Sequence, residues 1–264
     1  MLSPRGKEED FPWWLVILGI TFVYLFAQVI ADDLYAQVLQ TLTKGVKITV
    51  FVTLVGFALA SVMGLLLAVA SLSDSLFLRQ SARLYIEVVR GVPIIVLLLY
   101  VAFVAAPALV ALRNWVGDAV GLDPIRTRDF SLLWRAILAL AIGYSAFIAE
   151  VFRAGLQAID TGQIEAAEAL GLNRWQRFRF IVFPQAMRLI LPPLGNDFVA
   201  MVKDSSLVSV LGVLDITQLG KVTAAGNFRY FETYNVVALL YLTMTITLSL
   251  ALRRLERRLQ EKYP

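Results

Sequence analysis

The chain has 264 residues, of which 59% are hydrophobic and 17% charged, with a formal net charge of +4 and a mean hydropathy of +0.72. This composition lies far from that of soluble domains and predicts an all-α, polytopic membrane protein. The lack of cysteine and histidine excludes disulfides, thiolate nucleophiles, imidazole bases and the commonest metal ligands. Most enzyme functions are therefore disfavoured, and we expect no metal site in this chain.

Six apolar runs are each long enough to cross about 30 Å of hydrocarbon and predict about six transmembrane helices. They lie at residues 13–31, 46–72, 94–112, 132–152, 187–214 and 236–252. The first run follows Arg5 and Lys7 and exceeds the apolar core of a signal peptide, which has about 7 to 15 residues. We therefore interpret it as a retained helix.

The distribution of Lys and Arg predicts the orientation. With the N-terminus in the cytoplasm, fourteen of these residues fall on the cytoplasmic side and eight on the outer side, while Arg90 and Lys203 stay unassigned. The positive-inside rule favours this arrangement, with both termini cytoplasmic. Because the basic residues gather beside apolar runs, topology explains them and we expect no nucleic-acid partner.

Two connections and one absent motif bear on organisation. Residues 73–93 predict an interfacial stretch that leads into a helix beginning near Pro93. The polar composition and short length of residues 113–130 predict a loop on the outer side, with no separate domain. No G-x-x-x-x-G-K-[ST] stretch occurs, which excludes ATP hydrolysis by a P-loop in this chain.

A charged segment, "QIEAAEALGLNRWQRFRFIVFP", follows the fourth apolar run. Asp160 or Thr161 can cap a first short helix, and Gly171 suits a left-handed turn after it. Asn173 with Gln176 can cap a second helix, and the segment ends at Pro184. The segment could be an amphipathic loop on the lipid headgroups. Its alanine-rich side and its two acids favour a protein partner instead.

This segment resembles the signature of ABC importer membrane subunits, which reads E-A-A, three residues, G, nine residues, then I-x-L-P. The match is in register, with Phe183 where the signature prefers leucine. The flanks "YSAFIAEVFRAGLQAIDTGQ" and "PQAMRLILPPLGNDFVAMVKDSSLVSVLGVLDIT" resemble the polar amino-acid permeases of type I ABC importers. The resemblance covers residues 41–252 except the loop at 113–130. Residues 1–40 then form an N-terminal cytoplasmic tail with an extra transmembrane helix, and residues 253–264 form a cytoplasmic basic tail.

The resemblance implies a type I ABC importer permease fold in a bacterial inner membrane. It further implies alternating access, a second permease subunit that is identical or paralogous, a solute-binding protein, and separate ATPase subunits that bind ATP and Mg. Residues 160–184 would then couple the permease to the ATPase. The coupling candidates are Glu165, Ala166, Ala167, Gly171 and Arg174.

Ionisable residues inside the fifth apolar run form the candidate substrate site. Asp197 and Asp204 stand two helical turns apart on one line, and Lys203 is poorly placed to neutralise either within the helix. A zwitterionic amino acid needs acids for its ammonium and a cation or hydroxyl for its carboxylate. The candidates are Asp197, Lys203, Asp204 and Ser206, although an ion-pair network that only holds the helices together is the alternative.

Two further features concern helix ends and bends. The candidate residues from Asp197 to Ser206 form the Asp197 patch. Pro192 and Pro193, just before it, predict a bend or local unwinding. Glu150 with Arg153, and also Arg90, lie near cytoplasmic helix ends, where we expect anchoring and salt-bridge roles.

The leading function from this resemblance is ATP-driven import of polar amino acids by a subunit without catalytic residues. A secondary transporter or channel is the main rival, and it would transport without an ATPase. A membrane assembly factor is a second rival, for which changes at the Asp197 patch would have no substrate-dependent effect.

Overall fold

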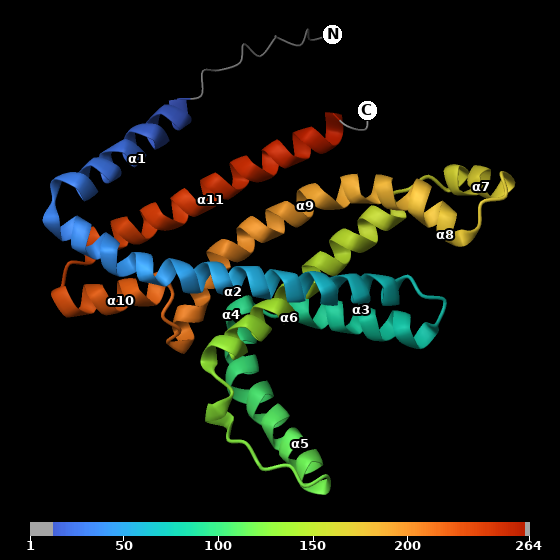
Figure 1. Ribbon diagram of the computed structural model, residues 1–264, viewed down its shortest axis with the longest axis horizontal. Helices are drawn as coiled ribbons and strands as arrows, with labels where there is room; N and C mark the ends of the chain where they lie inside the picture. Colours follow the sequence, from blue (N-terminus) through green and yellow to red (C-terminus); the bar gives the residue numbers. More distant parts are fainter. Residues whose placement is uncertain (1–12, 262–264) are drawn as a thin grey trace, which may run out of the picture.

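In the computed structural model, which describes residues 13–261, all the regular structure of the described chain is helical (Figure 1). This confirms the all-α prediction. Residues 1–12 of the predicted N-terminal tail and 262–264 of the basic tail lie outside the described residues. The predicted spans correspond to α1 (Trp13–Ala31), α2 (Asp33–Ser71), α4 to α5 (94–119), α6 (Leu132–Gln157), α9 (Phe183–Asp204) and α11 (Tyr230–Glu261).

Four of the described helices are long and apolar enough to cross a membrane by length and composition alone, namely α2, the continuous 94–119 helix, α6 and α11. The 94–119 helix comprises α4 (Ile94–Tyr100), the π-helical segment η1 (Val101–Ala105) and α5 (Ala106–Ala119). With α1 and α9, these make up the predicted set of about six spans.

Several boundaries differ from the sequence-based expectations. Helix α2 begins at Asp33, well before residue 46, because the side chain of Asp32 accepts a hydrogen bond from the backbone N–H of Leu34 and caps the helix. The predicted polar loop at 113–130 begins as helix, since α5 continues to Ala119. The expected interfacial stretch is an amphipathic helix, α3 (Leu76–Gly91), which leads into α4 through Pro93 as predicted.

Close packing of α2 on α6 forms the centre of the bundle. Small buried residues recur every fourth position on α2, at Gly56, Ala60, Gly64 and Ala68, which lets two helices approach closely in lipid. A Cβ atom added at Gly64 would lie 2.8 Å from Cγ2 of Ile148 on α6. The two helices therefore fix each other's position along this stripe.

Local unwinding near Pro192 and Pro193 does not occur, since α9 stays helical through both prolines. The interruption comes at its end, where the 3₁₀ segment η4 (Ser205–Leu211) begins and Gly212 takes a left-handed φ of 77°. Membrane helices tolerate proline because neighbouring groups and local adjustments satisfy the freed carbonyls. Helix α10 (Ile216–Asn227) then leads to α11.

The helices are arranged so that one end of the molecule gathers several chain segments. Figure 1 shows the last turns of α2 and α6 and the first turn of α3 at the same end as the short helices α7 (Thr161–Ala169) and α8 (Arg174–Arg177). Helix α10 lies at the opposite end. The charged segment thus caps one end of the bundle, away from the α10 end.

Candidate functional site

A cavity of about 520 Å³ opens between the α3–α4 junction, α6 and α9. Its polar or aromatic side chains are Arg90, Tyr144, Phe147, Asp197 and Asp204. The volume falls within the range of roughly 300 to 1,000 Å³ found for sites that enclose small molecules. This cavity is the candidate substrate site.

The structure brings Asp197 and Asp204 to this cavity together, on the line of α9 that the sequence predicted. The hydroxyl of Tyr144 on α6 donates a hydrogen bond of 2.8 Å to Oδ2 of Asp204. Within residues 13–261, Oδ2 of Asp197 is buried and has no hydrogen-bond partner. One acid of the pair is thus held by the protein, while the other has a buried carboxylate oxygen that no described group satisfies.

The structure does not bring Lys203 and Ser206 to the cavity. Lys203 is exposed on another side of α9. Ser206 lies in the 3₁₀ segment beyond the end of α9, so the angular position expected from a continuous α-helix does not apply to it. Neither side chain contributes to the cavity lining.

Sequence reasoning missed Arg90 as a cavity residue and assigned it an anchoring role. Its guanidinium lies over the ring of Phe147, 5.6 Å from the ring centroid, and it has no ion pair within the described part of the chain. Two features of the sequence could have indicated this role. Arg90 could not be assigned to either side of the membrane, and it directly precedes Gly91 and Pro93, where the chain turns into α4. Arg90 supplies the cation that Lys203 was expected to supply.

The lining has the charge pattern of a receptor for a zwitterion. Two carboxylates suit an ammonium group, and an arginine suits a carboxylate because its planar fork can donate two parallel hydrogen bonds. The aromatic rings and aliphatic side chains around them supply the apolar surface that small-molecule sites commonly have.

The charged segment, residues 160–184, contains the two predicted short helices. Asp160 caps α7, with its side chain accepting a hydrogen bond from the N–H of Gly162. Gly171 has a φ of 77°, and the N–H of Leu172 donates to the carbonyl of Ala167 across the turn. This is the Schellman arrangement that glycine favours at a helix end, so the predicted turn is confirmed.

The second short helix is confirmed at its start and corrected at its end. Asn173 and Gln176 form the predicted capping box, each side chain accepting from the other residue's backbone N–H. The predicted end at Pro184 is wrong, because α8 continues through the π-helical segment η3 (Phe178–Val182) directly into α9. Proline is tolerated there because it occupies the first turn of α9.

Two polar contacts join α7 to the continuous helix that α8, η3 and α9 form. Nη1 of Arg177 lies 2.6 Å from Oε2 of Glu168 in an ion pair between α8 and α7. The amide of Gln185 on α9 donates to Oε1 of Gln163 on α7 across 2.7 Å. These two contacts join α7 to the start of the helix that carries the two acids of the cavity.

Most of the coupling candidates face solvent. The exposed ones are Glu165, Ala166, Gly171 and Arg174. Ala167 is buried and faces the protein. Large apolar side chains beside them are also exposed, with Leu170 at 80% and Trp175 at 67%, and such an apolar tip among charges is typical of a protein interaction site.

Comparison with known proteins gives a consistent set of matches. Residues 60–262 match the family model described as "Binding-protein-dependent transport system inner membrane component". The chain is 37% identical over 219 residues to the glutamine transport system permease protein GlnP of Escherichia coli (strain K12), covering 83% of this chain and 93% of that protein. It is 34% identical to the probable amino-acid permease protein YxeN of Bacillus subtilis (strain 168), covering 84% and 93%.

Solved structures agree. A crystal structure of an amino acid ABC transporter with histidines matches with a TM-score of 0.69 and 35% identity, covering 83% of this chain and 94% of that chain. An alginate importer matches with a TM-score of 0.63, covering 93% and 89%, but at 15% identity this similarity concerns the fold alone.

Proposed function

The chain belongs to the family of inner membrane components of binding-protein-dependent transport systems and is a permease subunit of an ATP-driven importer for polar amino acids, and from this premise we propose how it binds and moves its substrate. The amino acid occupies the 520 Å³ cavity between α3, α4, α6 and α9. The alternating exposure of that cavity to the two sides of the membrane carries the substrate inward.

One observation carries the assignment of the site, namely that Asp197, Asp204 and Arg90 line the same cavity. The carboxylate of Asp197 accepts from the substrate ammonium, and Arg90 binds the substrate carboxylate. Tyr144 holds Asp204 in place through its hydroxyl. The predicted Lys203 and Ser206 stand outside this proposal because the cavity lining does not include them.

Residues 160–184 couple the permease to a separate ATPase. The exposed tip around Glu165, Leu170 and Trp175 docks on that subunit. Because the helix is unbroken from Arg174 to Asp204, the distance from the tip to Asp197 is about 35 Å along one rod at about 1.5 Å per residue. A tilt of the tip therefore moves the acids of the cavity directly.

The remaining parts of the transporter are separate chains. The ATPase subunits bind ATP and Mg, and this chain contributes no catalytic residue to hydrolysis. A second permease subunit, identical or paralogous, and a solute-binding protein complete the complex. The chain is a multi-pass protein of the inner membrane, with both termini and residues 160–184 on the cytoplasmic side.

Reconstitution tests the proposal against its rivals. The chain is incorporated into liposomes with its ATPase and binding protein, and ATP hydrolysis is measured with each polar amino acid in turn, among them L-glutamine, L-histidine and L-cystine. We expect at least one of them to stimulate hydrolysis and to accumulate only when ATP is present. Uptake by the chain alone under an ion gradient would instead establish a secondary transporter, and no response to any polar amino acid would exclude the assigned substrate class.

A further inference from the structure

A second cavity, of about 350 Å³, lies at the end of the bundle that carries α7 and α8, between the last turn of α2, helix α3 and the last two turns of α6. Every residue that lines it is polar or charged. The lining consists of Ser71, Arg83, Glu87, Glu150, Arg153 and Gln157. A cavity lined in this way does not suit an acyl chain or another apolar ligand, because apolar atoms would desolvate charges without pairing them.

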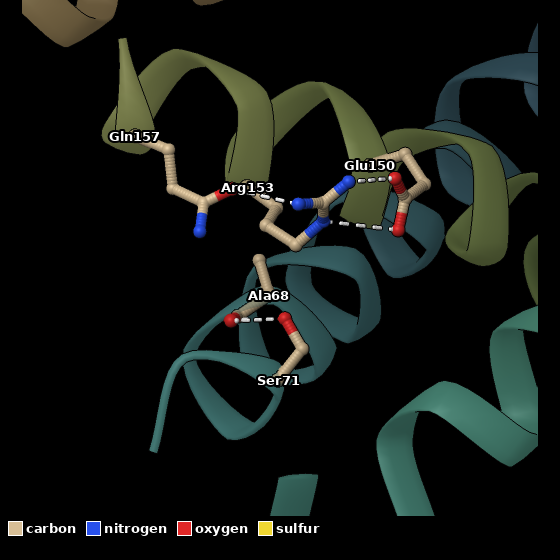
Figure 2. Close-up of polar contacts among 5 residues, drawn as sticks. All are labelled: Ala68, Ser71, Glu150, Arg153 and Gln157. Atoms are coloured by element: carbon tan, nitrogen blue, oxygen red, sulfur yellow. Dashed lines mark hydrogen bonds and ion pairs between the residues drawn. The ribbon is translucent and has the colours of Figure 1, made fainter. Parts of the chain in front are cut away.

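One side of this inner cavity is fixed by contacts within α6 (Figure 2). Arg153 donates from Nη2 to Oε2 of Glu150 across 2.6 Å and from Nη1 to Oε1 of Gln157, also across 2.6 Å. The salt-bridge role predicted for Glu150 and Arg153 is thereby confirmed. The two charges of this pair largely offset each other, although Glu150 also attracts the Arg83 guanidinium across the cavity.

The other polar groups of the inner cavity keep capacity to bind. Within residues 13–261, Arg83 and Glu87 form no hydrogen bond or ion pair. The amide nitrogen of Gln157 points away from Arg153 in Figure 2 and donates to no described residue. The hydroxyl of Ser71 donates to the carbonyl of Ala68 and retains lone pairs that can accept.

These available groups select the charge of the ligand. A simple anion would be attracted by Arg83 but repelled by Glu87, and a simple cation would meet the opposite conflict. A ligand that carries both charges a few ångströms apart satisfies both residues, with Gln157 as an extra donor to its carboxylate and Ser71 as an extra acceptor for its ammonium. The backbone end of a free amino acid has this charge pattern.

The inner cavity also follows the substrate cavity along the same pair of helices. On α3, Glu87 precedes Arg90 by three residues, and on α6, Phe147 precedes Glu150 by three residues, so each pair lies about one helical turn apart. Arg90 and Phe147 line the first cavity, and Glu87 and Glu150 line the second. The cation–π contact between Arg90 and Phe147 therefore lies at the junction between the two.

We propose that this inner cavity is a second binding site for the transported amino acid, on its release side, which holds the zwitterionic backbone of the substrate through Arg83 and Glu87. This inference rests on the proposed function, since it takes the cargo to be an amino acid. Its consequence is that amino acid already present in the cytoplasm occupies the site and slows further turnover.

The experiment uses the full complex in sealed liposomes. The binding protein is enclosed with each polar amino acid in turn, among them L-glutamine, L-histidine and L-cystine. ATP is added to the bath, so that only complexes with their cytoplasmic side facing the bath hydrolyse it. The enclosed amino acid that stimulates hydrolysis is then added to the bath at rising concentration. We expect it to inhibit hydrolysis, with a measurable half-inhibitory concentration.

Neutral variants locate the site. Arg83→Gln and Glu87→Gln should each raise the half-inhibitory concentration about tenfold, relative to their own uninhibited rates, because each loses one charge-assisted contact. Arg254→Gln, on the exposed end of α11 and outside the cavity, should stay within about twofold. Arg83→Lys keeps the positive charge and serves as a control for folding. Its half-inhibitory concentration should lie between those of Arg83→Gln and the unchanged chain.

The outcomes separate the two proposals. Stimulation from inside the liposome with no inhibition from the bath would overturn the inner site and leave the proposed function standing. Inhibition that Arg83→Gln and Glu87→Gln leave unchanged would overturn the assignment to this cavity. If no enclosed amino acid stimulates hydrolysis at all, the proposed function fails, and the inner site fails with it.

Discussion

The hydroxyl of Tyr144 on α6 and Oδ2 of Asp204 at the end of α9 are joined by a hydrogen bond of 2.8 Å inside the candidate substrate cavity. The bond links the helix that packs against α2 to the helix that carries both acids. Tyr144 is buried, at 5% exposure. Loss of this hydrogen bond would therefore leave a buried polar group unsatisfied, at a cost in free energy. The position of Asp204 therefore depends on α6.

Removing this bond tests whether Asp204 needs to be held. Tyr144→Phe keeps the ring and deletes only the hydroxyl, which leaves the carboxylate without its donor and costs about 1.5 to 3 kcal/mol for a charged hydrogen bond. We expect the amino-acid concentration for half-maximal stimulation of ATP hydrolysis to rise about tenfold or more. Tyr85→Phe, which loses a contact to Ser145 on the neighbouring α3–α6 packing surface, is the matched control and should change it little.

The role of Asp197 is tested in the same assay. Asp197→Asn removes the negative charge while keeping the shape of the side chain, and it should weaken ligand-stimulated transport by about 1.5 to 3 kcal/mol if one charged hydrogen bond to the substrate is lost. Assembly with the ATPase should persist. Lys203→Gln, on the same helix but outside the cavity, should leave the response unchanged. Normal transport by Asp197→Asn, or loss of the complex, would remove Asp197 from the site.

The parts of the fold that sequence could predict are those set by neighbours along the chain. The caps at Asp160 and Asn173 and the left-handed Gly171 follow from short-range hydrogen bonding and sterics. The spans could be predicted because the thickness of the bilayer sets the length that an apolar run needs to cross it. The shared direction of Asp197 and Asp204 follows from helical periodicity alone.

The parts that escaped prediction depend on contacts between distant segments. Tyr144 and Asp204 are 60 residues apart in sequence, and nothing near either residue indicates the other. Arg90 reaches the cavity because α3 packs against α6, which its local sequence does not encode. Ser206 was misplaced because the helix tightens to 3₁₀ at Ser205, a change that depends on the packing around it.

The close contact between α2 and α6 predicts a large penalty for added volume. Gly64→Leu places a Cβ atom 2.8 Å from Cγ2 of Ile148, so the helices must separate, at a cost of about 1 to 3 kcal/mol or more. We expect a lower midpoint of thermal unfolding in detergent. Gly19→Leu, where no atom lies within 4 Å of the added Cβ, is the control and should unfold at the original temperature. Equal midpoints would show that the packing of α2 against α6 does not depend on the small buried residues of α2.

The orientation is tested with single cysteines, which the cysteine-free sequence makes straightforward. Asn173→Cys lies in the turn between α7 and α8, and Asp123→Cys lies in the connection after α5. In intact cells an impermeant thiol reagent should label Asp123→Cys and leave Asn173→Cys unlabelled, with both labelled after permeabilisation. Labelling of Asn173→Cys from outside would invert the proposed topology.

The last prediction asks whether the turn at Gly171 serves stability or coupling. A residue with a β-carbon in the left-handed conformation costs about 1 to 2 kcal/mol, which is small beside a typical folding stability of about 5 to 15 kcal/mol, and no atom lies within 4 Å of a Cβ added at Gly171. Gly171→Val should therefore insert at near-normal levels. By tilting α7 against α8 it should abolish ligand-stimulated ATP hydrolysis, as should Glu165→Lys by reversing a charge on the docking surface.

Gly121→Val separates coupling from strain, because Gly121 has nearly the same backbone, with a φ of 73° against 77° at Gly171, and equally open surroundings. Gly121 lies between α5 and η2 (Thr127–Asp129), away from the charged segment, so this variant carries the same strain and should keep full stimulation. Loss of stimulation in both glycine variants would trace the effect to general destabilisation. Retained stimulation in Gly171→Val and Glu165→Lys would mean that residues 160–184 only rest on the lipid surface, because a docked coupling helix does not tolerate both a changed angle and a reversed charge.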